Sequence, residues 1–291
     1  MAILIKQRLK FSGGDADNHK VDAYAAAQSL EGIVWALTII THYGVSGKLR
    51  QRGDLSSSVR IFITPPKRGS VFYGLEVWIQ ENAFLAGMVG GYAVNTVTPF
   101  INGLVSYVLN ASLTGIRQIP HGAKKYIGRL KDDEVDDLIA RVEPPLTRAH
   151  AAIGKSVDLL QLTYRTKDLA TLDLDSKRYL EARAREDFQT IDTNITSFNV
   201  LTGNGRLYHP DEKQTVPFSL SPQAMLGTPQ VLTLSMSQYA SGNRGVIRLT
   251  AQRVQNIDGR LKQLIVSAAS EVPQSDWDAG QNPLRTPQNK P

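Results

Sequence analysis

The chain has 291 residues, a formal net charge of +6 and no cysteine. This length is sufficient for two domains, and a hydrophobic content of 42% is ordinary for a folded protein. The absence of cysteine excludes disulfides, cysteine-ligated metals, thiol catalysis and cysteine lipidation. The modest positive charge is compatible with an anionic partner.

The N-terminal segment alternates between apolar and basic residues, as a strand with one buried face does. Ile3, Ile5 and Leu9 alternate with Lys6 and Arg8. Because the basic residues interrupt the apolar run too early for a signal peptide, the sequence predicts a first domain that folds in the cytosol.

A helix is expected next, over residues 21–43, and glycines follow it. Two strands are expected over residues 57–64 and 71–79, joined by the tight loop PPKRGS. Together with the N-terminal strand, these elements predict a β-α-β-β unit over residues 1–81.

Residues 82–116 contain no Asp, Glu, Lys, Arg or His, although charged residues make up 21% of the chain. The stretch exceeds the about 20 residues that a helix needs to cross a bilayer core. On a helix its polar side chains gather on one face. The residues of this face, which a pore would turn toward its lumen, are Asn95, Thr98, Asn102, Ser106 and Asn110.

A helix face of uncharged amides, hydroxyls and glycines is typical of helices that pack in lipid or around a narrow aqueous pore. Gly87 and Gly91 form a G-x-x-x-G pair that would allow close helix packing. Pro99 divides the stretch into two short legs, which favours a re-entrant or oligomeric pore over a plain anchor. The alternatives are a buried helical hairpin of a soluble protein, with Pro99 near its turn, and an amphipathic partner-binding helix.

Five positive charges follow this stretch with no acid between them, and five acidic residues come directly after those. The basic run is typical of the cytoplasmic side of a membrane segment and equally of an oligonucleotide-binding surface. The acidic run most simply begins a helix, and we expect no metal there. The default role of the two charges in the PPKRGS loop is solvation. Together with three residues of the basic run, they are the candidate ligand-binding residues: Lys67, Arg68, Arg117, Lys124 and Lys125.

Helices are expected over residues 132–142 and 146–160, separated by Pro144 and Pro145. A charged, helical connector is expected to residue 190. The pattern then changes to period two, which predicts a small antiparallel β domain of the kind that binds oligonucleotides or mediates assembly.

The predicted fold class is therefore α+β: an N-terminal β-α-β-β unit, a central apolar or amphipathic helical segment with following helices, and a C-terminal antiparallel β domain. The C-terminal end is rich in proline and polar residues, which predicts a disordered tail. The expected regions are residues 1–81, 82–116, 117–190, 191–272 and 273–291.

The sequence contains no P-loop, dinucleotide fingerprint, H-E-x-x-H or G-x-S-x-G motif. Its five histidines are scattered along the chain. We therefore expect a protein that is not an enzyme and that uses no cofactor or metal.

The order of the segments resembles the membrane channel effector of Hailong-type bacterial anti-phage defence. The likeness rests on the GGDAD turn before a long helix, the PPKRGS loop, the uncharged middle, and the late NGRLY and VPF strands, Asn204–Tyr208 and Val216–Phe218. It is a likeness of layout that covers most of the chain, and it identifies no ligand residue.

The resemblance implies a homo-oligomeric channel in the bacterial inner membrane, in contact with lipid. A nucleic-acid oligomer made by a partner nucleotidyltransferase would keep the channel closed, and release of the oligomer would depolarise an infected cell. The alternative from the residues is a soluble, cytoplasmic oligomeric scaffold or oligonucleotide-binding protein, with residues 82–116 buried at the subunit interface.

Overall fold

The chain forms two compact units, residues 1–182 and 183–291, and each is described by itself. The computed structural model describes residues 2–49, 58–64, 71–128, 130, 132–181, 183–255, 259 and 261–272. Residues 1–81, which were expected to form a domain, are instead part of the larger first unit. The boundary also lies before residue 190, because the charged segment at residues 183–193 is a strand of the second unit.

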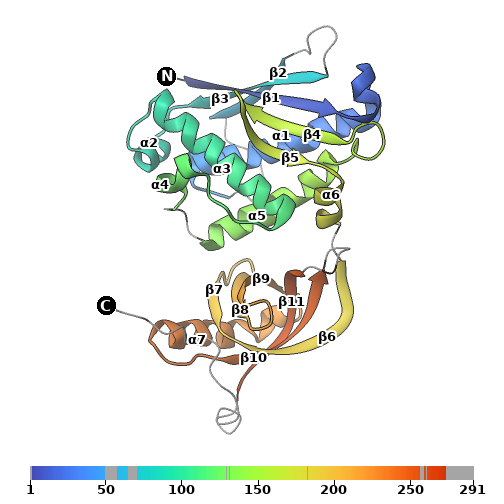
Figure 1. The fold of residues 1–291 in the computed structure, drawn as a ribbon. Coiled ribbons are helices and arrows are strands. Elements are labelled where there is room, and N and C mark those ends of the chain that lie inside the picture. Colours follow the sequence, from blue (N-terminus) through green and yellow to red (C-terminus); the bar gives the residue numbers. More distant parts are fainter. Residues whose placement is uncertain are drawn as a thin grey trace, which may run out of the picture. The chain divides into compact units, whose positions relative to one another are not determined.

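The first unit is built on a five-stranded antiparallel sheet with the strand order β2-β3-β1-β4-β5 (Figure 1). The predicted β-α-β-β unit is present in it, as β1, α1, β2 and β3. The strands are β1 (Ala2–Ser12), β2 (Val59–Thr64), β3 (Phe72–Gln80), β4 (Leu159–Tyr164) and β5 (Lys167–Leu172).

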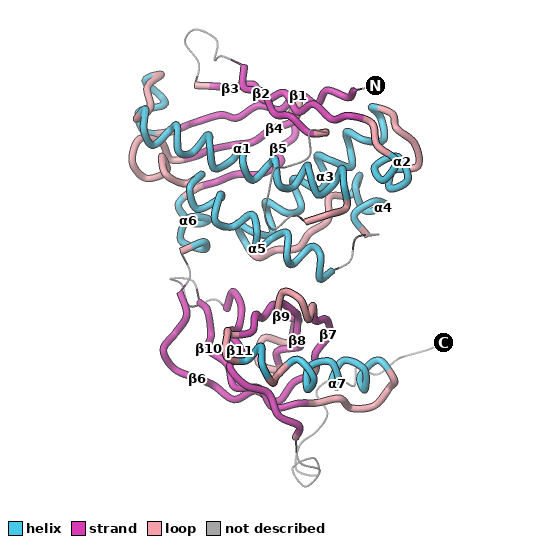
Figure 2. The backbone as a smooth tube through the Cα atoms, turned by 180° about the vertical axis from the view of Figure 1, so that it is seen from behind, coloured by secondary structure: helices cyan, strands magenta, loops and turns pink. Residues whose placement is uncertain are grey.

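Helices cover only one face of this sheet, as Figures 1 and 2 show. This follows from the alternation in β1, where Ile3, Ile5 and Leu9 are buried while Lys6 and Arg8 are exposed. The helices are α1 (Ala23–Ser46), α2 (Ala83–Val89), α3 (Val94–Thr114), α4 (Lys124–Ile127), α5 (Asp132–Ala149) and α6 (Leu174–Leu180), with short 3₁₀ helices η1 (Gly14–Asn18) and η2 (His121–Ala123).

The uncharged stretch forms α2 and α3, which meet at an angle of 89°. The break lies at residues 90–93, where Gly90 adopts a left-handed conformation with φ 76°, and not at Pro99, which lies inside α3. Much of α3 is buried in the core of the unit.

Among the described helices, α1 alone is long and apolar enough to cross a membrane by length and composition, and half of its apolar window is buried inside the unit. The bent pair of α2 and α3 also passes this test when it is counted as one span. A core helix of a soluble protein has the same properties.

Close helix contacts occur at glycines other than the predicted pair. A Cβ added at Gly32 in α1 would lie 2.4 Å from the backbone nitrogen of Ala149 in α5, and one at Gly103 in α3 would lie 2.1 Å from the Cβ of Ala123. Added Cβ atoms at Gly87 and Gly91 would meet nothing within 4 Å. The G-x-x-x-G pair therefore makes no close helix contact within the described part of the chain.

The region after residue 132 differs most from expectation. Helix α5 continues through both Pro144 and Pro145 to Ala149, because Val142, Leu146 and Ala149 are completely buried and tertiary packing outweighs the lost hydrogen bonds. The predicted helix over residues 146–160 is wrong, and strands β4 and β5 replace the helical connector.

The second unit is a six-stranded sheet with the order β6-β10-β11-β9-β8-β7. All of its strand pairs are antiparallel except β9 with β11. Its elements are β6 (Arg183–Thr193), β7 (Ile195–Phe198), β8 (Asn204–His209), β9 (Gln214–Leu220), η3 (Ala224–Leu226), α7 (Pro229–Ala240), β10 (Ile247–Gln255) and β11 (Leu261–Glu271).

The two edge strands of this sheet are consecutive in the chain, because only Asn194 separates β6 from β7. They therefore act as one bent strand that pairs with β10 at its start and with β8 at its end, which curls the sheet into a barrel. Helix α7 lies between β9 and β10 in the sequence. With β6–β7 counted as the first strand, this is the Greek-key connectivity of the OB-fold.

Candidate functional site

The outer surface of β8 and β9, hereafter the barrel face, carries alternating polar residues. Arg206 is paired across the strands with Pro217, and Tyr208 with Thr215. The intervening Leu207 is completely buried in the barrel core. The period of two therefore directs the guanidinium and the phenol ring outward, to the same surface.

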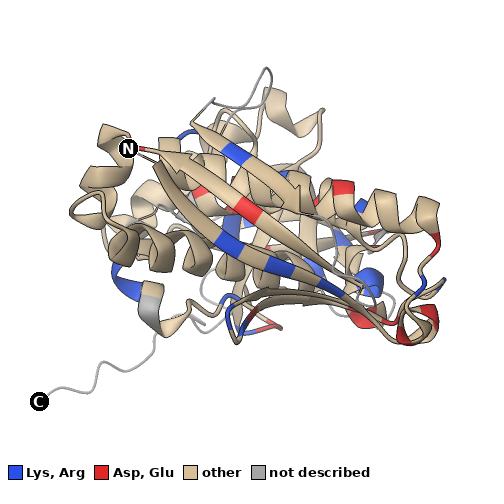
Figure 3. Ribbon diagram, turned by 90° about the horizontal axis from the view of Figure 1, so that it is seen from above, with Lys and Arg blue, Asp and Glu red and all other residues tan. Residues whose placement is uncertain are grey.

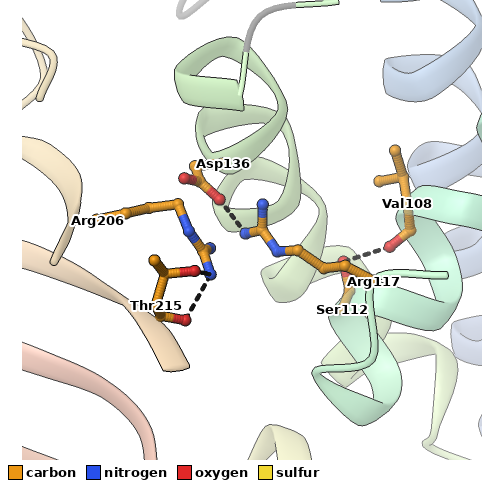
Figure 4. Close-up of polar contacts among 6 residues, drawn as sticks. All are labelled: Val108, Ser112, Arg117, Asp136, Arg206 and Thr215. Atoms are coloured by element: carbon orange, nitrogen blue, oxygen red, sulfur yellow. Dashed lines mark hydrogen bonds and ion pairs between the residues drawn. The ribbon is translucent and has the colours of Figure 1, made fainter. Parts of the chain in front are cut away.

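The guanidinium of Arg206 is held against the neighbouring strand. Its Nη2 donates hydrogen bonds to the backbone oxygen of Thr215, at 2.7 Å, and to the Thr215 hydroxyl, at 3.2 Å (Figure 4). These bonds place a permanent positive charge on the barrel face, because an arginine stays protonated at all physiological pH values. A preorganised cation of this kind suits a phosphate group.

The loop between β7 and β8 borders the barrel face. Asn199 stabilises the loop, because its Oδ1 accepts hydrogen bonds from the backbone nitrogens of Leu201, at 3.0 Å, and Thr202, at 3.3 Å. Gly203 ends the loop with φ 73°, and Leu201 is 91% exposed. In OB-folds this loop and the loop between the last two strands flank the ligand-binding face.

A shallow hollow of about 610 Å³ lies elsewhere on the same unit, where β6 and β10 meet the β8–β9 turn. Arg248 and Asp192 line it and form a bidentate ion pair with two hydrogen bonds of 2.8 Å. The carboxylate offsets the charge of this arginine, which weakens the hollow as an anion site.

The residues predicted to line a pore lie mostly inside the first unit. Thr98 and Asn102 are each only 6% exposed, and Gln7 on β1 donates a 2.8 Å hydrogen bond to the Asn102 side chain. Asn110 donates hydrogen bonds to the backbone oxygens of Ser106, at 2.7 Å, and of Leu169 on β5, at 2.8 Å.

In the described fold Asn102 and Asn110 of this polar stripe are therefore bonded to the sheet of their own chain. Asn95, at the start of α3, is exposed and is the exception. A role of these residues in a channel stays a prediction.

The predicted ligand-binding cations that the structure describes have different surroundings. Lys124 and Lys125 are exposed on α4, and the Lys125 ammonium lies 6.0 Å from the centre of the Tyr126 ring. Arg117 instead forms an ion pair with the buried Asp136 (Figure 4). Lys67 and Arg68 lie outside the described residues.

A histidine–serine pair in the first unit has a structural role. His150 is 1% exposed; its Nδ1 lies 2.7 Å from the backbone oxygen of Leu146, and its Nε2 lies 2.8 Å from the Ser176 hydroxyl. Ser176 forms the capping box of α6 with Asp173. Burial lowers the pKa of His150, as does the nearby charge of Lys177. The burial of both side chains closes the pair to a substrate.

Within the described part of the chain, no cluster of three histidine or carboxylate side chains could hold a metal ion. Sequence reasoning also missed Arg206 and Tyr208 as site residues. The available signal was the alternation of the segment NGRLYH, Asn204–His209, which places both on the outer side of one strand.

Two family models match the chain, and their limits agree with the two structural units. Residues 7–181 match a model described as "Domain of unknown function (DUF7946)", and residues 187–270 match one described as "Family of unknown function (DUF7947)". No curated protein and no solved structure matches the chain significantly. Because the first match covers more than half of the sequence, the chain belongs to the DUF7946 family.

Proposed function

We propose that this protein is an oligonucleotide-binding protein and that its C-terminal barrel binds single-stranded nucleic acid on the barrel face. The observation that carries the proposal is the connectivity of the barrel, which presents β8 and β9 as the binding strands of an OB-fold. Arg206 lies on these strands as a positioned phosphate ligand, and Tyr208 lies beside it as a ring for base stacking.

The expected affinity depends on both side chains. Stacking of one base on an aromatic ring contributes about 1–3 kcal/mol by alanine substitution. Each phosphate contact with a single strand adds about 0.7 to the slope of log affinity against log salt concentration. A single strand is the expected ligand because its bases expose their ring faces, whereas a duplex buries them in stacks.

The proposal is tested by fluorescence anisotropy with labelled single-stranded DNA and RNA of about 15 nucleotides, a length within the range that one OB-fold covers. Titrations at several salt concentrations give the affinity and its salt slope. We expect Tyr208→Ala to weaken binding about five- to 150-fold, and Arg206→Gln to weaken it and lower the salt slope.

The matched control is Arg178→Gln, which removes an exposed arginine from α6 of the first unit. It should leave the affinity for the oligonucleotide unchanged. Wild-type affinity in both Tyr208→Ala and Arg206→Gln would refute the assignment of the barrel face. The absence of any binding by the wild-type protein would refute the function itself.

A second candidate function is the oligomeric membrane channel of an anti-phage system, in the bacterial inner membrane. The observation that favours it is the uncharged character of α2 and α3, which together are apolar enough for a broken span or a re-entrant loop. In this proposal α3 must leave the sheet, because Asn102 and Asn110 are bonded to Gln7 and Leu169 in the described fold.

Expression in bacteria with a membrane-potential dye, followed by fractionation, tests the channel. Depolarisation together with recovery in the membrane fraction is the expected result. A wholly soluble protein that leaves the membrane potential unchanged would refute this second candidate.

A further inference from the structure

Among the described residues of the first unit, helices cover one face of the sheet and leave the other face open. This open face consists of the outward positions of β1, β2 and β3, on the side opposite α1, α3 and α5 (Figures 1 and 2). Figure 3 looks onto it and marks in colour the positions of the charged residues along the strands. Its residues include Leu4, Lys6, Arg8 and Lys10 on β1, Arg60, Phe62 and Thr64 on β2, and Phe72, Gly74, Glu76 and Trp78 on β3.

Three aromatic rings lie exposed on the open face. Phe62 is 48% exposed, Phe72 41% and Trp78 40%. Phe62 and Trp78 form an edge-to-face pair with ring centres 6.4 Å apart. Phe72 and Trp78 are six residues apart on β3, which separates them by about 20 Å at roughly 3.4 Å per residue.

Cations accompany these rings in the register of the sheet. Arg60 lies directly opposite Trp78, and Lys10 lies opposite Phe72 with its ammonium 5.5 Å from the ring centre. Arg8 lies opposite Gly74, and the Thr64 side chain from β2 lies over this glycine, because a Cβ added at Gly74 would lie 2.2 Å from the Thr64 hydroxyl oxygen.

The charge of the open face is strongly one-sided. On β1, β2 and β3, Lys6, Arg8, Lys10 and Arg60 are opposed by Glu76. Asp168 on β5 adds an acidic residue to the same side of the sheet, because it pairs with Thr163, which pairs with Arg8. The Lys6 ammonium lies 3.6 Å from the Glu76 carboxylate, yet the Lys6 side chain remains 72% exposed. Such an exposed pair contributes little binding energy of its own, so Lys6 remains accessible to an anionic ligand.

We propose that the open face is a second binding site for single-stranded nucleic acid, distinct from the barrel face. Bases stack on Trp78 and Phe72, and the phosphates between them contact Arg8 and Lys10. Exposed rings that alternate with cations suit a chain of flat bases and regularly spaced negative charges. A duplex presents its phosphates but buries the faces of its bases in stacks, so it could contact the cations of this surface without stacking on its aromatic rings.

The test uses the full chain with Arg206→Gln and Tyr208→Ala in the barrel, so that binding by the open face is measured separately. In this background we expect labelled single-stranded oligonucleotides still to bind and to quench tryptophan fluorescence. Adding Trp78→Leu and Phe72→Leu should weaken binding at least fivefold, while Arg8→Gln and Lys10→Gln should each lower the salt slope by about 0.7.

The matched control is Trp35→Leu, because Trp35 on α1 is also 40% exposed but lies on the helical side of the unit. It should leave the affinity unchanged. Circular dichroism spectra identical to those of the parent protein show that each variant folds.

Four results would overturn the proposal. The first is affinity in the barrel-deficient background that does not change with Trp78→Leu, Phe72→Leu, Arg8→Gln and Lys10→Gln. The second is a duplex that binds as tightly as the single strand, and the third is binding to anionic lipid vesicles without binding to oligonucleotides. The fourth is loss of all binding in the barrel-deficient background, which would leave the barrel as the sole site.

Discussion

The buried pair of Gln7 and Asn102 allows a quantitative test of the position of α3 in the fold. The two side chains are 2% and 6% exposed and join β1 to α3 through one hydrogen bond of 2.8 Å. Replacing one partner by an apolar residue of similar shape removes the bond and leaves the other amide buried without its partner. Such a loss costs about 1–3 kcal/mol.

We therefore expect Gln7→Met and Asn102→Leu each to lower the free energy of unfolding by about 1–3 kcal/mol, and their combination to restore it to near the wild-type value. Because the double variant returns to near the wild-type value, the coupling energy of the double-mutant cycle should equal the sum of the two single losses, about 2–6 kcal/mol in magnitude. Urea unfolding followed by tryptophan fluorescence measures it, because Trp35 and Trp78 both lie in the first unit.

The control is Asn95→Leu, at the exposed start of the same helix, which should change the stability by no more than about 0.5 kcal/mol. Additive effects of Gln7→Met and Asn102→Leu would refute the reasoning. They would mean that the two side chains do not touch in the dominant state, as required if α3 leaves the sheet to form a pore.

Three further predictions concern the first unit. Because burial lowers the pKa of His150 and an unfolded histidine titrates near 6.5, the free energy of unfolding should fall as the pH decreases below about 6.5. His150→Gln should flatten this pH dependence in urea titrations. Equal pH dependence in the wild type and the variant would contradict the assignment to His150. Gly32→Ala should destabilise the unit by at least about 2 kcal/mol in thermal unfolding, because the added methyl group clashes with α5. Gly87→Ala, on an open surface, should be neutral or slightly stabilising. Equal effects of the two substitutions would contradict the close helix contact at Gly32. Arg117→Met should cost about 2–3 kcal/mol in the same assay, because it removes the cation paired with the buried Asp136; an unchanged melting temperature would show that this pair does not stabilise the fold.

Local patterns in the sequence predicted the elements whose burial has a simple period. The alternation of Ile3, Ile5 and Leu9 placed β1 correctly, and the apolar stripe before Gly47 placed most of α1. Pro144 and Pro145 misled the prediction because burial against α1 outweighs a local breaking tendency. Strands β4 and β5 were missed because they lie beside charged turns that resembled a helical connector.

The direction of the polar stripe on α3 could not be predicted, because a phased face shows only that the helix has two different environments. Gln7 supplies the partner of Asn102 from 95 residues away in the chain, and no local pattern connects them. The open face could not be predicted from the sequence for the same reason. Lys10 and Phe72 become neighbours only through the pairing of β1 with β3, and strand order is not encoded in the period of a strand.

The place of β1 at the centre of its sheet has a consequence for synthesis on the ribosome. One neighbour of β1 is β4, whose Thr163 pairs with Arg8 across roughly 150 residues of chain. At about 5–20 residues per second, this partner emerges about 8–30 s after β1. The uncharged α2 and α3 emerge during that interval, before the chain that covers them. A nascent chain of this design presents these uncharged helices to chaperones and to the membrane-insertion machinery before its own sheet is complete.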